Sequence, residues 1–236
     1  EGAKGFYEGE TAALIVEEMK RGGGIISLED LKKYQAKSRT PIVFNYRGYD
    51  VISFAPPSSG GILIGQMLKM IEPFNVQKMG FQTPASVQLM IEVERRAYAD
   101  RAAHIGDPAF YKVPQKTLLN SVYIKNRMLD YKPGIAGSSE QIGAGNTSTS
   151  EETTHFSIVD PEGNMVAVTT TLNGGYGNKT VVGGAGFILN NEMDDFSAKP
   201  GSPNMYGAIG GEANSIAPYK RMLSSMTPTL LTKNKK

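Results

Sequence analysis

Apolar and polar residues alternate with a helical period in three stretches of the first half of the chain. The pattern predicts helices over residues 11–21, 61–71 and 84–104. In the third stretch Val87 and Ile91 recur at a spacing that places their side chains on one helical face. The pattern in this part of the chain therefore predicts helices that pack against a core.

Four other stretches have the pattern of strands. They cover residues 40–46, 49–55, 155–160 and 165–172. The last two flank a Pro-Glu-Gly-Asn turn and predict a hairpin. Ser27 and Asp30 predict a capping box, and PPSSGG at 56–61 predicts a strand-to-helix turn, since it lacks the lysine of a phosphate-binding loop. The order of elements predicts an α+β layered domain.

Residues 132–152 form a polar tether ahead of the hairpin. They read KPGIAGSSEQIGAGNTSTSEE, which predicts a mobile surface loop that is easily cleaved. Thr153 follows, and a Thr-Thr pair at a strand entrance is ordinarily β-branched filler. If the Glu152–Thr153 bond were cleaved, Thr153 would carry a hydroxyl nucleophile and a free amine, as in the N-terminal nucleophile hydrolases.

Four motifs make a resemblance specific. They are TTHFS at 153–157, TTTLN at 169–173, NNEMDDFSAKP at 190–200 and RMLSSMTP at 221–228. In order and spacing they resemble the γ-glutamyltranspeptidase family, also called glutathione hydrolases. The similarity extends back through residues 98–107, 56–61, 46–49, 40–41 and 5–7, so it covers essentially the whole chain.

The resemblance implies a role for each of nine residues. It implies cleavage between Glu152 and Thr153, Thr153 as nucleophile, Thr171 as its orienting partner, Asn173, Glu192 and Asp195 as ligands of the substrate α-amino group, Ser224 and Ser225 as ligands of its α-carboxylate, and Tyr206 in a lid loop. Taken singly, the acidic pair at 194–195 reads as a solvated turn and the serine pair as loop filler. The resemblance favours the functional interpretation, because all four motifs fall in family order.

The resemblance also implies a fold and a subunit arrangement. It implies the four-layer αββα sandwich of N-terminal nucleophile hydrolases, with residues 1–152 from the C-terminal part of a large subunit and residues 153–236 from the N-terminal part of a small one. Both parts belong to one domain, so the subunits are expected to remain associated as a heterodimer after autocatalytic cleavage.

The implied activity is γ-glutamyl transfer without a cofactor. The donor is glutathione or a related γ-glutamyl compound, and the acceptor is water, an amino acid or a dipeptide. One alternative is a related acylase, either a poly-γ-glutamate depolymerase or a cephalosporin acylase. A second is a catalytically silent homologue with a binding role.

Two family features have no counterpart in the sequence: an arginine that pairs with the α-carboxylate, and a glycine pair that forms the oxyanion hole. We therefore expect a fragment of an unprocessed precursor that is poorly active alone, because loss of one oxyanion donor typically costs about 100- to 1,000-fold.

Composition narrows the functional classes. The 236 residues carry a net charge of only +2, which gives no reason to expect a nucleic-acid partner. The chain has no cysteine, which excludes thiol catalysis. Two histidines are too few for a histidine metal site, and no apolar run predicts a membrane segment. The resemblance implies a periplasmic or extracellular location.

Overall fold

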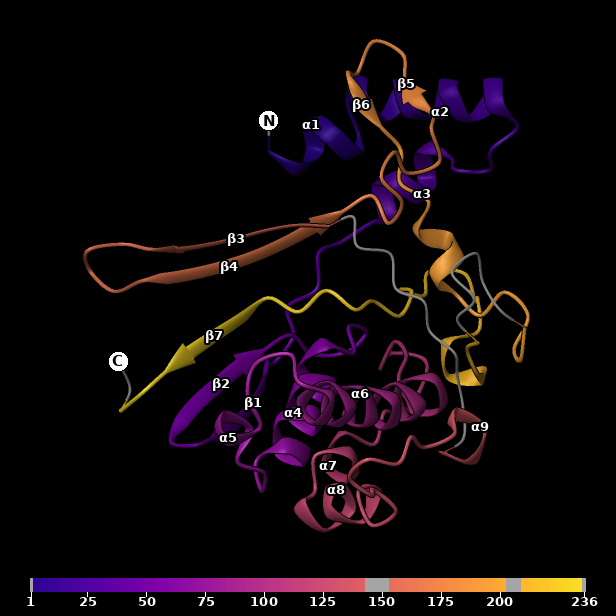
Figure 1. The fold of residues 1–236 in the computed structure, drawn as a ribbon. Helices are drawn as coiled ribbons and strands as arrows, with labels where there is room; N and C mark the ends of the chain where they lie inside the picture. Colours follow the sequence, from indigo (N-terminus) through magenta and orange to yellow (C-terminus); the bar gives the residue numbers. More distant parts are fainter. Residues whose placement is uncertain (1, 143–152, 203–208, 235–236) are drawn as a thin grey trace. The chain divides into compact units, whose positions relative to one another are not determined.

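The structure of the chain is a computed structural model that describes residues 2–142, 153–202 and 209–234 (Figure 1). It is a mixed helix and sheet structure, which confirms the α+β class. The chain forms two compact units. The first unit consists of Glu1–Arg39 and Thr171–Asn191, and the second of Thr40–Thr170 and Glu192–Lys236.

Three helices and a small hairpin build the first unit. The helices are α1 (Ala3–Tyr7), α2 (Glu10–Gly22) and α3 (Leu28–Lys33), and the hairpin pairs β5 (Val181–Val182) with β6 (Phe187–Ile188). The predicted capping box is confirmed, because Ser27 Oγ accepts from Asp30 N and Asp30 Oδ2 accepts from Ser27 N. Phe6 stacks on Phe187 at 5.8 Å between ring centroids. Segments more than 130 residues apart in sequence thus share this unit.

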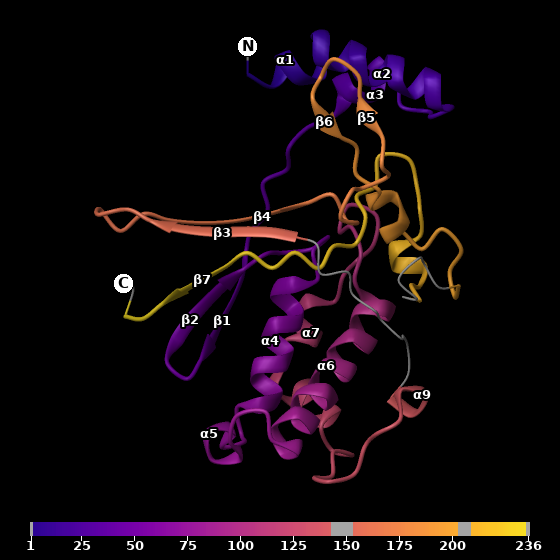
Figure 2. The ribbon, with the colours of Figure 1, turned by 45° about the horizontal axis from the view of Figure 1, so that its top comes forward.

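An antiparallel sheet of three strands organises the second unit, in the order β1 (Ile42–Tyr46), β2 (Tyr49–Ser53), β7 (Thr229–Thr232). Helices α4 (Gly60–Ile71) and α6 (Pro84–His104) lie on one side of it (Figure 2). Ile42 of β1 is buried against Ile62 and Leu63 of α4. The predicted helices and strands are confirmed here, and pairing with β7 places the segment before β7 beside the start of α4.

Short helices complete the second unit. They are α5 (Val76–Met79), α7 (Gln115–Leu118), α8 (Ser121–Arg127), α9 (Ser139–Ile142) and the 3₁₀ helices η1 (Glu192–Asp195) and η2 (Glu212–Asn214). Helix α9 falls inside the stretch predicted as a loop, so the loop prediction is wrong for residues 139–142. The segment just ahead of α9 is attached to α6: Gln88 donates to the carbonyl oxygens of Lys132 and Ile135, and Glu92 accepts from Gly137 N. Residues 143–152 lie outside the described residues.

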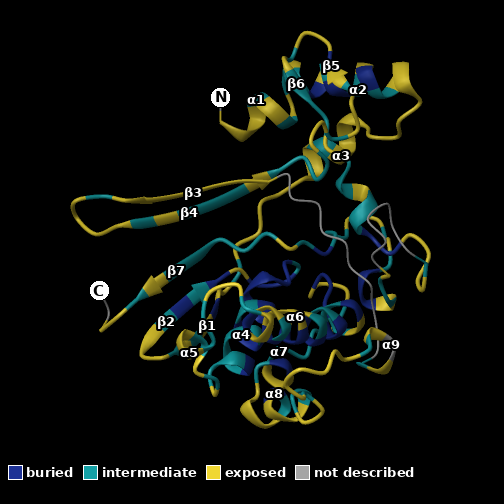
Figure 3. Ribbon diagram, viewed as in Figure 1, coloured by how far each residue is buried: buried dark blue, intermediate teal, exposed yellow. Residues whose placement is uncertain are grey.

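The predicted hairpin is confirmed as β3 (Thr153–Val159) paired with β4 (Met165–Thr171). Its turn is closed by Asp160, whose Oδ1 accepts from Asn164 N at 2.7 Å. His155 Nδ1 and Thr169 Oγ1 lie 2.8 Å apart across the strands. Strand β3 is exposed along its whole length (Figure 3), although it carries large apolar side chains such as Phe156 and Ile158.

Candidate active site

The turn before α4 holds the predicted carboxylate-binding serines in place. Ser58 Oγ donates to Met226 O at 2.6 Å, Ser59 N donates to Ser224 O at 2.8 Å, and Ser224 N donates to Pro57 O at 3.2 Å. The predicted strand-to-helix turn is confirmed. The sequence did not indicate that the hydroxyl groups of this turn donate hydrogen bonds to backbone carbonyls of a segment about 165 residues away. Both backbone groups of Ser224, its N–H and its C=O, therefore have hydrogen-bond partners in this turn.

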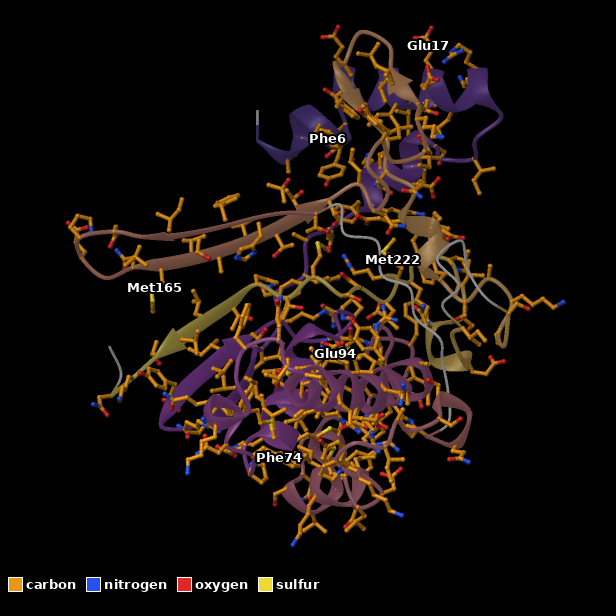
Figure 4. All side chains as sticks on the ribbon, viewed as in Figure 1. Phe6, Glu17, Phe74, Glu94, Met165 and Met222 are labelled. Carbon is orange, nitrogen blue, oxygen red and sulfur yellow. The ribbon has the colours of Figure 1, made fainter. Side chains whose placement is uncertain are left out.

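Close packing accompanies these bonds. A Cβ atom added at Gly60 would lie 2.3 Å from Thr227 Oγ1, so only glycine allows this approach. Met222, labelled in Figure 4, belongs to the segment that leads into Ser224. Asp107 fixes the start of that segment, since its Oδ2 accepts from Arg221 N at 3.0 Å. The family motifs at 56–61, 98–107 and 221–228 thus meet in one place.

The acidic residues of the predicted amino-binding site lie on η1. Asp195 is half-buried, and burial raises the pKa of its carboxyl to about 6; the charge of Arg101 opposes this shift, while Glu192 and Asp194 reinforce it. Burial also raises the pKa of Glu192. Both carboxylates are therefore incompletely solvated anions, a state that favours binding of a cation.

Asn214 connects the acidic and serine segments, and the sequence did not indicate it. This side chain is 3% exposed. Its Nδ2 donates to Asp195 O at 2.6 Å, and its Oδ1 accepts from Leu223 N at 2.9 Å. One buried amide thus links η1 to the segment ahead of Ser224 by hydrogen bonds. No local sequence pattern distinguishes such an asparagine from one in a surface turn.

We expect Asn214→Ala to destabilise the protein by about 2 kcal/mol, because two backbone groups would lose their partners in a buried place. The midpoint of urea denaturation of the full-length protein measures this loss. Asn178, an exposed residue of the first unit whose side chain accepts from the nearby Thr180 N, offers a control. Asn178→Ala should stay within about 1 kcal/mol of the parent protein. Equal stability of the two variants would contradict the assigned bridge.

Arg101 of α6 is a further residue that the sequence interpretation missed. Its Nε donates to Ser59 Oγ and its Nη2 donates to Ser225 Oγ, each at 3.1 Å. The structure therefore brings Ser224, Ser225, Glu192 and Asp195 into one neighbourhood of the second unit, with Arg101 between the serine and acidic segments.

The remaining predicted residues are distributed as follows. Thr171 and Asn173 lie in the first unit, where Asn173 N donates to Thr171 Oγ1 at 2.9 Å and Asn173 Nδ2 donates to Asn191 O at 3.3 Å. Asn173 has φ of 70°, a left-handed conformation that asparagine tolerates. Thr153 is exposed at the first residue of β3. Glu152 and Tyr206 lie outside the described residues.

The described residues also bear on two other features, a metal site and a membrane-spanning helix. In the described ranges, no group of three or more His, Cys, Asp or Glu residues is arranged to hold a metal ion. Within the same ranges, none of the helices combines the length and the apolar character that crossing a bilayer requires.

Comparison with known proteins places this arrangement in a family. The sequence profile described as Gamma-glutamyltranspeptidase matches residues 1–236. A glutathione hydrolase proenzyme of Escherichia coli (strain K12) is 49% identical over 233 residues, which cover 98% of this chain and 40% of the relative. The chain therefore belongs to the γ-glutamyltranspeptidase family.

Solved structures agree with this assignment. A cephalosporin acylase from Bacillus halodurans superposes with a TM-score of 0.76 at 25% identity, over 99% of this chain and 39% of its own. The γ-glutamyltranspeptidase of Helicobacter pylori superposes with a TM-score of 0.56 at 42% identity, over 59% of this chain and 40% of its own. The chain spans about 40% of the length of the curated relatives it matches.

Proposed function

We propose that the protein containing this chain is a γ-glutamyltransferase and glutathione hydrolase. It transfers the γ-glutamyl group of glutathione and related compounds through an ester on Thr153 to water, amino acids or peptides. One observation carries this proposal: the acidic segment at 192–195 and the serine pair at 224–225 both lie close to Arg101 in the second unit. That pairing of opposite chemistries fits the two charged groups of an amino acid head.

The two segments suit a γ-glutamyl donor. An α-ammonium group that leaves water needs carboxylate partners, which Glu192 and Asp195 supply. An α-carboxylate needs hydroxyl or N–H donors, which Ser224 and Ser225 supply. The roles that the resemblance implies for Thr171, Asn173 and Tyr206 remain predictions alongside these.

The proposed chemistry starts with cleavage of the Glu152–Thr153 bond, which gives Thr153 an α-amine. Such an amine has an ordinary pKa of about 7.7–8.0 and can act as a base near neutral pH. It accepts the hydroxyl proton as Thr153 Oγ attacks the γ-carbonyl carbon. The C–N bond then breaks, the proton passes to the leaving amine, and a γ-glutamyl ester remains. Water or an acceptor amine attacks that ester, which releases the product and regenerates the hydroxyl.

The composition of the compact units supports a heterodimer. Each unit contains residues from both sides of position 153: the first combines Glu1–Arg39 with Thr171–Asn191, and the second extends from Thr40 across that position. A cleavage there would leave both products engaged in both units. We therefore propose that the subunits remain associated after cleavage. From the family resemblance we further propose an αββα sandwich and a periplasmic or extracellular location.

A donor panel tests the function. Purified full-length protein is given glutathione, a γ-glutamyl anilide and a glutaryl amide, and products are identified by mass spectrometry. We expect glutamate from the first two donors and, with dipeptide acceptors, γ-glutamyl peptides. Preferential cleavage of the glutaryl amide would replace this proposal by an acylase function, which the extensive superposition on cephalosporin acylase makes the second candidate.

The raised pKa of Asp195 predicts a pH dependence. A carboxyl with a pKa of about 6 is protonated below that pH and then cannot pair with the α-ammonium of the donor. Protonation of the Thr153 amine lowers kcat/KM for a γ-glutamyl anilide below about pH 7.7. Protonation of Asp195 should add a second fall of about tenfold per pH unit below pH 6. Asp195→Asn should lower kcat/KM about 10- to 100-fold at pH 8 and remove this second acid limb.

A control separates this effect from general acid damage. Asp160→Asn changes a partly exposed carboxylate in the β3–β4 turn, where hydrogen bonds from Asn164 lower the pKa of the carboxyl. Its acid limb should match that of the parent protein. An unchanged limb in Asp195→Asn would show that another group controls donor binding.

A further inference from the structure

Arg101 lies where the acidic and serine segments of the second unit approach each other. Its two hydrogen bonds go to hydroxyl groups, Ser59 Oγ and Ser225 Oγ. Its charge also acts on the carboxyl of Asp195. A single side chain thus touches the serine segment and influences the acidic segment electrostatically.

Arg101 is a half-buried cation. In the part of the chain that the structure describes, no carboxylate forms an ion pair with it; besides the two hydroxyl groups, it lies 5.9 Å from the centre of the Tyr98 ring. Burial lowers the pKa of Arg101, as expected for a cation withdrawn from water. A withdrawn charge needs a counter-charge, and an anion bound beside Ser225 would supply one.

The direction of the bond to Ser225 matters as much as the charge. A guanidinium group has donors only, so Ser225 Oγ must be the acceptor. A serine hydroxyl has a single hydrogen, which this bond leaves available to donate in another direction. Because Ser225 is exposed, a ligand carboxylate can reach that hydrogen.

We propose that Arg101 is a positioning residue of the γ-glutamyl site. It holds Ser225 as a hydrogen-bond donor to the α-carboxylate of the substrate, and it places a positive charge beside that carboxylate. Ser59 fixes the guanidinium from the other side and also donates from its Oγ to Ser224 O at 2.9 Å. This inference rests on the proposed function.

The test compares three anilide donors on the full-length protein. The γ-glutamyl donor carries both charged groups, the glutaryl donor lacks the amine, and the 4-aminobutyryl donor lacks the carboxylate. Variants are Arg101→Gln, Arg101→Lys and Ser225→Ala. The control is Arg21→Gln, because Arg21 has a side chain that is 73% exposed and pairs with Glu18 of its own helix, α2. Intact mass and thermal unfolding confirm equal processing and folding.

We expect Arg101→Gln to raise KM for the γ-glutamyl and glutaryl donors about 10- to 100-fold, with a much smaller change in kcat. The change for the 4-aminobutyryl donor should be less than about threefold. Arg101→Lys should recover part of the loss, because it keeps the positive charge. Arg101→Gln should move the acid limb of kcat/KM that Asp195 causes to higher pH, because it removes the charge that opposes protonation of Asp195. Ser225→Ala combined with Arg101→Gln should cost less than the sum of the two single changes.

Two results would overturn the inference in different ways. Equal losses for donors with and without the carboxylate, in a parent protein that uses γ-glutamyl donors, would make Arg101 a purely structural residue. Failure of the parent protein to use any of the three donors would reject the proposed function and this inference together. If the parent prefers the glutaryl donor, the comparison of glutaryl with 4-aminobutyryl still decides the role of Arg101.

Discussion

Thr153→Ala should abolish both self-cleavage and acyl transfer in the full-length protein. The change removes the hydroxyl that attacks the carbonyl of Glu152 and, later, the γ-carbonyl of the donor. Removal of a hydrolase nucleophile lowers kcat by about a millionfold, so residual activity should be undetectable in an ordinary assay. Intact mass after prolonged incubation measures cleavage, and release of glutamate from a γ-glutamyl donor measures transfer.

The neighbouring threonine is a matched control. Thr154 is also exposed on β3 and β-branched, so Thr154→Ala changes the strand without touching the proposed nucleophile. We expect two cleavage products and activity close to that of the parent protein. Thr153→Ser, which keeps a hydroxyl, should retain cleavage at a reduced rate. Cleavage before position 153 in Thr153→Ala would reject Thr153 as the self-activating residue.

Arg96→Ala should lower the free energy of unfolding by about 3–5 kcal/mol. Arg96 is 1% exposed and donates to Glu92, to Asp130 Oδ1 at 2.7 Å and to Arg127 O at 2.6 Å. Its removal would leave the carboxylate of Glu92, itself 2% exposed, with Arg95 as its remaining ion-pair partner. The midpoint of urea denaturation at unchanged slope measures the loss.

Lys69→Ala is the control for Arg96→Ala. Lys69 pairs with Glu72 at 2.8 Å, but both side chains are 34% exposed, and such pairs contribute about 0–1 kcal/mol. Adding Glu92→Gln to Arg96→Ala should recover part of the stability, because it removes the poorly compensated charge. A loss below 1 kcal/mol in Arg96→Ala would show that the buried ion pair contributes little.

The same network should make the fold sensitive to acid. Burial alone would raise the pKa of Glu92, but hydrogen bonds from Arg96 and Gly137 hold it below its ordinary value of 4.5; the bond from Arg96 likewise lowers the pKa of Asp130 below 3.8. A lowered carboxyl pKa contributes stability that is complete above the ordinary value and is lost as the pH falls through the folded value. Arg96→Ala should therefore show a smaller loss of stability below about pH 4.5 than the parent protein.

Local patterns predicted the three longest helices and the four longest strands of the described residues. The helix predicted over residues 84–104 has the observed bounds, and the hairpin after Thr153 was displaced by only two residues at its start. Periodicity, capping and turn chemistry act between residues a few positions apart, so they are readable in one dimension. Helix α9 escaped prediction, and the segment that leads into it is held by Gln88 and Glu92, which lie on a different helix.

The sequence by itself determined the family, the longer helices and strands, and the residues that the motifs mark, from Thr153 to Ser225. Only the tertiary structure identified Arg101 and Asn214 as neighbours of those residues. Arg101 reaches Ser225 across 124 positions, and Asn214 unites two segments through backbone groups that any residue possesses. Such contacts depend on how the sheet and helices bring distant segments together, whereas the sequence records only which side chains are available.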